Sequence, residues 1–213
     1  MLELSAITLA TPQRHLLSDF HAQIAPGQVL AVMGPSGCGK SSLLGFIAGT
    51  LSPILRASGQ VRLQGRDVHT LPTMQRRVGM LFQDDLLFPH MTVQDNLLFA
   101  LPADGSRAHR TAQAAAALSH ADLDGLGARW PSSLSGGQRA RVSVLRALLA
   151  QPQALLLDEP FSRLDSELRA RFRSFVFERL RSLNIPALLV THDAQDVPAG
   201  AQVMQWPAEL RRA

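Results

Sequence analysis

The sequence lacks several features that mark other classes of protein. It contains one cysteine, Cys38, which excludes an internal disulfide framework. Its apolar runs, such as Ala154–Leu157 and Ala187–Val190, have the length of strands and fall far short of the roughly 20 apolar residues of a membrane span. No basic region followed by an apolar segment opens the sequence, as a secretory signal would require. We therefore expect a protein of the cytosol.

Lysine is almost absent. Of the 21 basic residues, all except Lys40 are arginines, and the formal net charge is +4. A compact ammonium and a planar guanidinium are not equivalent ligands, so the one retained lysine indicates a position where arginine cannot serve. The arginines are scattered along the chain, and this distribution does not favour a nucleic-acid partner.

Segments with the pattern of strands alternate with segments typical of helices. A chain of 213 residues suffices for one sizeable domain, and this alternation predicts an α/β fold with a parallel sheet. Residues 84–150 are mainly helical in pattern, so we expect a helical subdomain inserted into a core of about residues 1–83 and 151–213. The expected strands are Leu2–Leu9, Leu30–Met33, Val61–Leu63, Val78–Phe82, Ala154–Leu157 and Ala187–Val190. The expected helices are Lys40–Ala48, Thr92–Ala100, Ala108–Leu118, Gly136–Ala150 and Ser166–Leu183.

Residues 34–41 read GPSGCGKS and match the phosphate-binding pattern GxxxxGK[ST]. Glycines let backbone N–H groups turn toward phosphate oxygens, and the helix that follows adds its positive dipole end. In this pattern Lys40 neutralises the β- and γ-phosphates, and Ser41 ligates Mg²⁺. The alternative is a glycine-rich turn, which gives this string in roughly one random chain in a hundred. The predicted nucleotide-binding residues here are Gly34, Pro35, Ser36, Gly37, Cys38, Gly39, Lys40, Ser41 and Ser42.

Two acids follow the apolar run Leu155–Leu157. Ligands bind at the carboxyl ends of parallel strands, where Asp158 and Glu159 are expected to lie. Asp158 is a candidate Mg²⁺ ligand opposite Ser41, and Glu159 is a candidate to polarise the water that attacks the γ-phosphate. Taken alone, the acid pair could equally be a solvated turn.

Leu134–Gln138 reads LSGGQ and begins a predicted helix. Here the sequence resembles the ATP-binding cassette (ABC) family, which carries this signature after a phosphate loop and before an acid pair. A serine hydroxyl and glycine N–H groups at a helix start form a second anion site. Its predicted residues are Ser135, Gly136, Gly137 and Gln138.

The resemblance covers nearly the whole chain and implies roles for three further residues. Gln83 matches the glutamine that senses Mg²⁺ and the attacking water, and Asp165 in SRLD matches the acid of the D-loop. His192 matches the histidine that contacts the γ-phosphate. The implied fold is a P-loop NTPase (RecA-like) core with a small antiparallel β subdomain and an inserted helical subdomain.

One family element is missing. Members of the family usually stack an aromatic residue on adenine from the loop after the first strand, a position that falls near Thr11 and Pro12. No aromatic residue of the Phe, Trp or Tyr type lies there, and the chain has no tyrosine. Arg14 or His15 could stack on the base instead.

The resemblance also implies partners. Two copies are expected to pair head to tail, with each ATP between the phosphate loop of one and the LSGGQ of the other. A transmembrane permease is expected to dock near residues 86–93, although Leu87 and Phe88 could equally belong to the subdomain core. The chain looks like small importer ATPases for thiamine, iron, sulfate or polyamines, which would place it on the inner face of the cell membrane and link it indirectly to a periplasmic solute-binding protein.

Two alternatives belong to other functional classes. A soluble ABC ATPase acting on DNA would carry a long coiled-coil insertion between Gln83 and Leu134, and one acting on ribosomes would carry two cassettes. The LSGGQ string argues against a soluble kinase. After Trp206 few residues remain in the sequence, so no regulatory domain is expected there.

Overall fold

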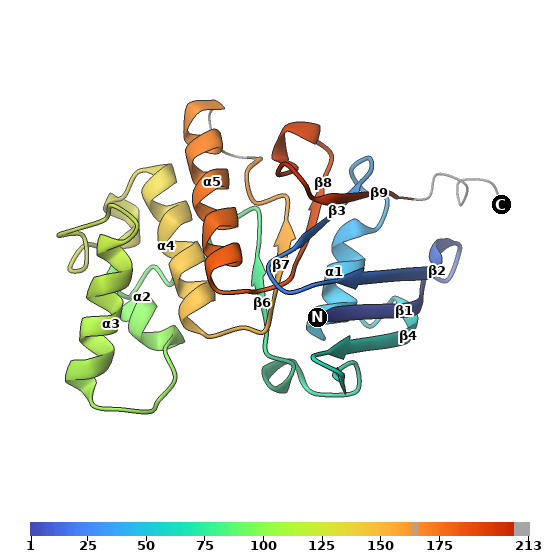
Figure 1. Ribbon diagram of the computed structural model, residues 1–213, viewed down its shortest axis with the longest axis horizontal. Coiled ribbons are helices and arrows are strands. Elements are labelled where there is room, and N and C mark those ends of the chain that lie inside the picture. Colours follow the sequence, from blue (N-terminus) through green and yellow to red (C-terminus); the bar gives the residue numbers. More distant parts are fainter. Residues whose placement is uncertain (163, 165, 207–213) are drawn as a thin grey trace. The chain divides into compact units, whose positions relative to one another are not determined.

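The computed structural model describes residues 1–162, 164 and 166–206. These residues form two compact units (Figure 1). The first unit comprises residues 1–80, 153–159 and those from 179 onward, and the second comprises residues 81–152 and 160–178. Each unit has its own hydrophobic core.

The first unit contains a five-stranded sheet of order β6-β7-β8-β3-β9. Its central strands pair in parallel, with Leu155 and Val29 both opposite Ala187, and Leu30 opposite Gln202. The central strands are apolar and buried, as expected of strands covered on both faces. The strands are β3 (Val29–Met33), β6 (Val78–Leu81), β7 (Ala154–Asp158), β8 (Ala187–Thr191) and β9 (Gln202–Gln205).

A four-stranded antiparallel sheet of order β2-β1-β4-β5 completes the strands of this unit. Its strands are β1 (Leu2–Ala10), β2 (His15–Ile24), β4 (Arg56–Leu63) and β5 (Arg66–Asp67). The register between β1 and β4 shifts between Ser5 and Thr8. At this bulge a Cβ on Gly59 would lie 2.7 Å from the carbonyl oxygen of Ala6, so only glycine fits.

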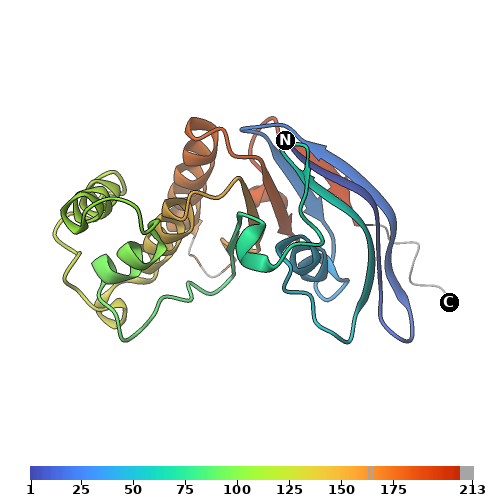
Figure 2. The same ribbon diagram turned by 90° about the horizontal axis from the view of Figure 1, so that it is seen from below.

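The core of the first unit joins the two sheets through helix α1 (Lys40–Ala48) (Figure 2). Leu43, Leu44 and Ile47 of α1 are fully buried together with side chains from both sheets. The N-terminus of α1 is therefore fixed at the carboxyl end of β3, where the phosphate loop begins.

The second unit is helical. It contains α2 (Val93–Ala100), α3 (Arg107–Ser119), α4 (Gly136–Leu149) and residues 166–178 of α5 (Ser166–Ser182). Short 3-10 helices are η1 (Thr73–Gln75) in the first unit, η2 (Pro131–Ser133) in the second, and η3 (Ala194–Asp196) in the first. The core of the second unit draws side chains from α2, α3 and α4, including Leu97, Ala114 and Val142.

The α/β fold class predicted from the sequence is confirmed, including the small antiparallel sheet. The strands β2, β5 and β9 were not predicted. In β2, exposed His15, Asp19 and His21 alternate with buried residues, and β9 lies at a sheet edge with mostly exposed side chains, so neither has a long apolar run. The second unit also takes in residues 160–178, which the expected division had assigned to the core.

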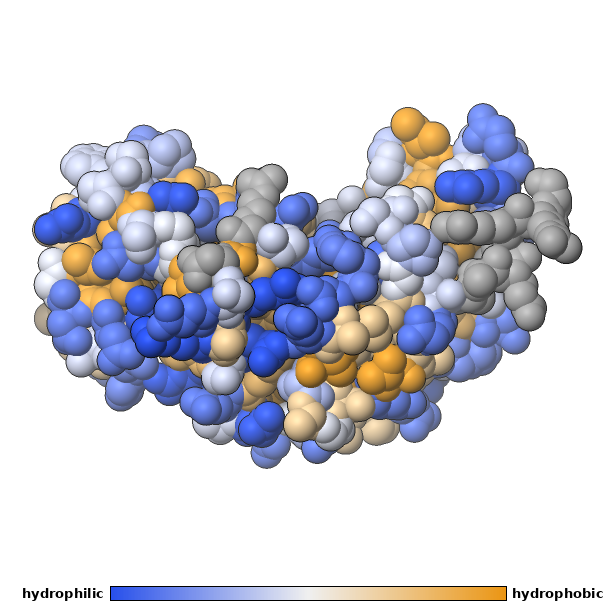
Figure 3. Space-filling model, turned by 90° about the horizontal axis from the view of Figure 1, so that it is seen from above, coloured by the Kyte–Doolittle hydropathy of each residue, from blue (hydrophilic) through white to orange (hydrophobic). Residues whose placement is uncertain are grey.

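Among the described residues, no helix combines the length and apolar character that crossing a membrane requires. Figure 3 shows one face of the molecule, on which hydrophobic residues occur in small groups among hydrophilic ones.

Candidate nucleotide-binding site

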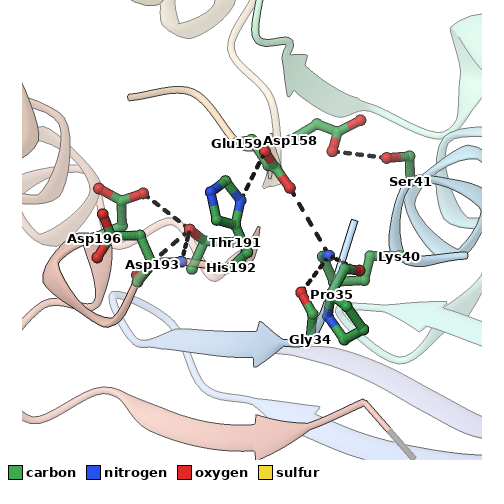
Figure 4. Close-up of polar contacts among 10 residues, drawn as sticks. All are labelled: Gly34, Pro35, Lys40, Ser41, Asp158, Glu159, Thr191, His192, Asp193 and Asp196. Carbon is green, nitrogen blue, oxygen red and sulfur yellow. Dashed lines mark hydrogen bonds and ion pairs between the residues drawn. The ribbon is translucent and has the colours of Figure 1, made fainter. Parts of the chain in front are cut away.

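The phosphate loop runs from the end of β3 to the start of α1. Lys40 is 4% exposed, and its Nζ donates to the carbonyl oxygens of Gly34 at 2.7 Å and Pro35 at 2.8 Å (Figure 4). Gly37 and Gly39 have φ angles of 74° and 115°, which favour glycine. The loop thus curls around its own lysine, and the helix N-terminus that follows suits an anion.

The hydroxyl of Ser41 donates to Oδ1 of Asp158 at 2.9 Å, joining residues 117 positions apart. Burial raises the pKa of Asp158, and the charge of Glu159 raises it further, whereas the Ser41 hydrogen bond and Lys40 lower it. A carboxylate whose ionised form is disfavoured in this way gains from a nearby cation. No cluster of three or more His, Cys, Asp or Glu side chains suited to a metal occurs among the described residues. A hydroxyl oxygen and a carboxylate oxygen 2.9 Å apart are ligands of the kind that Mg²⁺ binds.

Glu159 lies between two positively charged or titratable groups. Its Oε1 is 3.8 Å from Nζ of Lys40, and its Oε2 is 3.1 Å from Nδ1 of His192 (Figure 4). The φ angle of Glu159 is 45°, in the left-handed region that non-glycine residues rarely adopt. Its backbone N–H is held by the carbonyl oxygen of Val190 at 3.0 Å. Such backbone strain is common where a side chain is held for function.

His192 follows β8 and is exposed, but the residues on either side of it, Thr191 and Asp193, are hydrogen-bonded. The Thr191 hydroxyl donates to Oδ2 of Asp196 at 2.9 Å, and both residues are buried. The same hydroxyl oxygen accepts from the N–H of Asp193 at 3.1 Å. The Thr191 hydroxyl thus links the residues on both sides of His192. Asp196 was not predicted from the sequence, although an acid four residues after the histidine was a visible signal.

A buried arginine anchors the other end of α1. Nη1 of Arg76 donates to the carbonyl oxygens of Phe46 at 2.7 Å and Ile47 at 2.9 Å, and its Nε donates to that of Leu71 at 2.8 Å. Burial lowers the pKa of Arg76. A cation at the C-terminus of a helix complements its dipole. Arg76 thus holds the helix that presents the phosphate loop, a role that the sequence did not reveal.

The LSGGQ segment lies in the second unit, at the N-terminus of α4. Ser135 is the N-cap: its side chain accepts from the N–H of Gln138 at 3.3 Å, and Oε1 of Gln138 accepts from the N–H of Ser135 at 2.9 Å. Ser135 and Gly136 are exposed, whereas Gly137 is buried, where a Cβ would lie 2.5 Å from Cδ2 of Leu168. In the bond from Gln138 the hydroxyl acts as an acceptor, so its hydrogen can be donated to an anion.

Comparisons with known proteins decide the family. The family model described as "ABC transporter" matches residues 17–162. The ABC transporter ATP-binding protein YnjD of Escherichia coli K12 is 47% identical over 209 residues, covering 97% of this chain and 96% of YnjD. The chain belongs to the ABC transporter family. It is an ATP-binding subunit of that family and an ATPase.

Two further similarities extend this assignment. The Fe(3+) ions import ATP-binding protein FbpC 1 of Rhizobium meliloti 1021 is 42% identical over 184 residues, covering 86% of this ABC subunit and 51% of FbpC 1. The chain therefore spans about half the length of these iron-import relatives. A dimeric, post-hydrolysis structure of the ATP-binding cassette MJ0796 bound to ADP and Pi superposes with a TM-score of 0.80 at 27% identity. It covers 97% of this ABC subunit and 94% of the MJ0796 chain.

The predicted site residues of this ABC subunit are divided between its two units. Gln83 lies in the second unit and lines a cavity of about 130 Å³ together with Gly136 and Arg139. Asp165 lies outside the described residues, as does Arg163. In the first unit, side-chain contacts link Ser41 to Asp158 and link Glu159 to Lys40 and His192.

The β1–β2 loop, where family members place an aromatic residue, forms a tight turn. The N–H of Thr11 donates to the carbonyl oxygen of Arg14 at 2.8 Å, and the Thr11 hydroxyl oxygen accepts from the N–H of Arg14 at 3.0 Å. Pro12, Arg14 and His15 are all exposed. The side chains suggested as substitutes for the missing ring therefore remain accessible to a base.

Proposed function

We propose that Lys40, Ser41, Asp158, Glu159 and His192 form the phosphate and catalytic half-site of this ATPase. Lys40 would neutralise the β- and γ-phosphates, while the N–H groups of residues 34–42 would donate to phosphate oxygens. Support comes from the burial of Lys40 and from its two carbonyl partners, which fix the ammonium at the centre of the loop. An ordered ammonium loses little further entropy when phosphate arrives.

Ser41 and Asp158 would hold Mg²⁺, with Gln83 as a further ligand. This ion supplies charge neutralisation between the β- and γ-phosphates. The 2.9 Å contact between the two oxygen ligands and the raised pKa of Asp158 both support the assignment.

Glu159 would orient and polarise the water that attacks the γ-phosphate, and His192 would contact that phosphate. The 3.1 Å pairing of His192 with Glu159 supports this, because it places a hydrogen-bond donor and a carboxylate at the same point. Phosphoryl transfer needs positioning and electrostatic stabilisation rather than covalent chemistry, and these side chains can supply both.

The second half-site would be the LSGGQ of a partner copy. Ser135, Gly136, Gly137 and Gln138 would receive the γ-phosphate of the partner's ATP, with Asp165 at the same interface, in a head-to-tail homodimer. The exposed Ser135 and Gly136 at the positive end of α4 support this.

A transmembrane permease would dock on the second unit, and the assembly would import a small solute delivered by a periplasmic binding protein. The FbpC relatives are import ATPases by name, which supports this direction. Within residues 86–93, Leu86 is 52% exposed and Pro89 and His90 are exposed, whereas Leu87 packs in the core. The docking surface would therefore be Leu86, Pro89 and His90, at the cytoplasmic face of the membrane.

The observation that carries the proposal is the convergence of one buried lysine, one serine–carboxylate pair and one glutamate–histidine pair around a single loop. The test is co-purification of tagged chain with membrane subunits from detergent extracts. Leu86→Glu should lose those subunits and keep ADP affinity. Ile54→Glu is the matched control, since Ile54 is 71% exposed in the first unit, and it should retain them. ATPase stimulation by DNA or ribosomes, without any membrane partner, would contradict the transport proposal.

A further inference from the structure

Trp206 lies next to the residue that precedes the phosphate loop. It directly follows β9, and its backbone N–H donates to the carbonyl oxygen of Met33 at 2.6 Å. Met33 is the last residue of β3 and precedes Gly34, so the ladder between β3 and β9 extends to the point where the loop begins (Figure 1).

The Trp206 side chain fills the space beneath the loop. It is 6% exposed and belongs to the core of the first unit. A Cβ built on Gly34 would lie 2.6 Å from Cβ of Trp206, and one built on Gly39 would lie 3.3 Å from its Cζ2. The tryptophan side chain therefore contacts both the first and the last glycine of the loop.

The middle of the loop has little comparable support. A Cβ on Gly37 would meet no described atom within 4 Å, and Pro35, Ser36 and Gly37 are exposed. At the Gly39 end, the β2 residue Leu16 joins Trp206, with its Cβ also 3.3 Å from a Cβ on Gly39. The two ends of the loop are thus set by packing, and Trp206 is the contact that they share.

We propose that Trp206 is a positioning residue for nucleotide phosphate. Its indole fixes the spacing of Gly34 and Gly39, and thereby the direction of the N–H groups between them. The inference rests on the phosphate half-site proposed above. Large aromatic side chains suit this task because they bury much area with few rotatable bonds. Because the side chain is buried against the loop, it acts through the loop and not by stacking on the base.

The same contact makes Trp206 a spectroscopic reporter. The chain has two tryptophans, and the other, Trp130, is 50% exposed in the second unit. In a Trp130→Phe protein, emission comes from Trp206 alone. Adding ADP should shift or change that emission, whereas adenosine at the same concentration should leave it unchanged, because adenosine places no phosphate in the loop.

The substitution experiment compares Trp206→Ala and Trp206→Phe with Phe20→Ala. Phe20 is 8% exposed and belongs to the same core, but it lies on β2 and is not among the nearest neighbours of a Cβ built on Gly34 or Gly39. Trp206→Ala should raise the Kd for ADP and the KM for ATP by roughly five- to thirtyfold, with a smaller change in kcat. Trp206→Phe should recover most of the affinity. Phe20→Ala should lower the melting temperature and leave Kd unchanged.

Equal Kd values for Trp206→Ala and wild type, or an equal rise in Phe20→Ala, would overturn the positioning role. An emission spectrum of Trp130→Phe that does not change when ADP is added would also overturn the positioning role. This test requires no substitution at position 206. Lys40→Ala separates the two proposals. If Lys40→Ala binds ADP like wild type, the half-site itself is wrong; if it loses ADP while Trp206→Ala does not, only the role of Trp206 fails.

Discussion

The two proposed anion sites of this ABC subunit are built in different ways. In the first unit, Lys40 is 4% exposed and the contacts join distant parts of the chain, such as Ser41 and Asp158. In the second unit, the exposed Ser135 is held by a capping box with Gln138, three residues away. The first site depends on the assembled fold, whereas the second depends on one helix start. Damage to the first should weaken nucleotide binding by a separate molecule, whereas damage to the second should impair ATP turnover only where two molecules meet.

The largest effect is expected at Glu159. Glu159→Gln keeps the shape of the side chain but removes its charge, so ATP binding should persist while turnover falls by about 100-fold or more, as for loss of a general base. Size-exclusion chromatography with ATP and Mg²⁺ should show an accumulated dimer. Glu178→Gln, at an exposed glutamate of α5, is the control and should keep wild-type turnover. Rapid hydrolysis by Glu159→Gln would remove that residue from the catalytic role.

Lys40→Ala should be the next most severe change. Loss of a charged donor to phosphate weakens binding by about 1.5–3 kcal/mol, or roughly 10- to 150-fold in Kd. Calorimetry with ADP measures this in the separate subunit. Lys40→Arg should also bind poorly, because the space around the ammonium is closed by the carbonyls of Gly34 and Pro35. Wild-type affinity in either variant would contradict the phosphate loop assignment.

Ser135→Ala tests the anion site proposed in the second unit. The lost N-cap should lower the free energy of unfolding by about 1 kcal/mol. Ser106→Ala removes a cap of the same kind from α3, where Ser106 accepts from the N–H of His109 at 3.2 Å. Both variants should be destabilised alike and bind ADP normally, but only Ser135→Ala should lose ATP turnover. Equal turnover in the two variants would reduce Ser135 to a structural cap.

The smallest effect on nucleotide affinity is expected from changes in the β1–β2 turn that would contact the adenine base. The tight turn from Thr11 to Arg14 offers no aromatic ring, so a stacking contribution of ~1–3 kcal/mol is missing. Pro12→Tyr, at an exposed position, should tighten ATP binding by no more than about fivefold, the lower end of that range. Competition by GTP should be close to that by ATP in wild type. A strong preference for ATP over GTP would show that Arg14 or His15 already makes a contact that distinguishes adenine from guanine.

Local motifs could be predicted from the sequence, whereas contacts between distant segments could not. GPSGCGKS and LSGGQ predicted α1 and α4 to within one residue, because glycines, caps and helix starts are local features. The strand Ala154–Asp158 was predicted as Ala154–Leu157 from its apolar run. Asp158, expected as a magnesium ligand opposite Ser41, accepts a hydrogen bond from the Ser41 hydroxyl.

Other contacts depend on how distant segments pack. Arg76 bonds to the C-terminal end of α1, the helix that follows the phosphate loop, and Trp206 packs against the glycines at the two ends of the loop. Neither residue lies in a motif. The edge strand β9 gave no periodic signal, because most of its residues are exposed. A residue whose partners are backbone carbonyls or glycines leaves little trace in the sequence.

The central claim is that a working ATP site needs one half from each of two molecules, and mixing two inactive variants tests it most directly. Lys40→Ala removes the phosphate half. Gly136→Asp removes the signature half by adding a negative charge where a Cβ has open space, its nearest neighbour being Nη2 of Arg139 at 4.0 Å. Gly136→Ala is the control for volume and should remain active.

Each inactive variant should show little ATPase activity alone. In an equal mixture, half of the dimers are heterodimers with one intact composite site, so activity should return to about a quarter of the wild-type value. Activity that stays at the level of the separate variants, although heterodimers form, would contradict a site shared between two subunits.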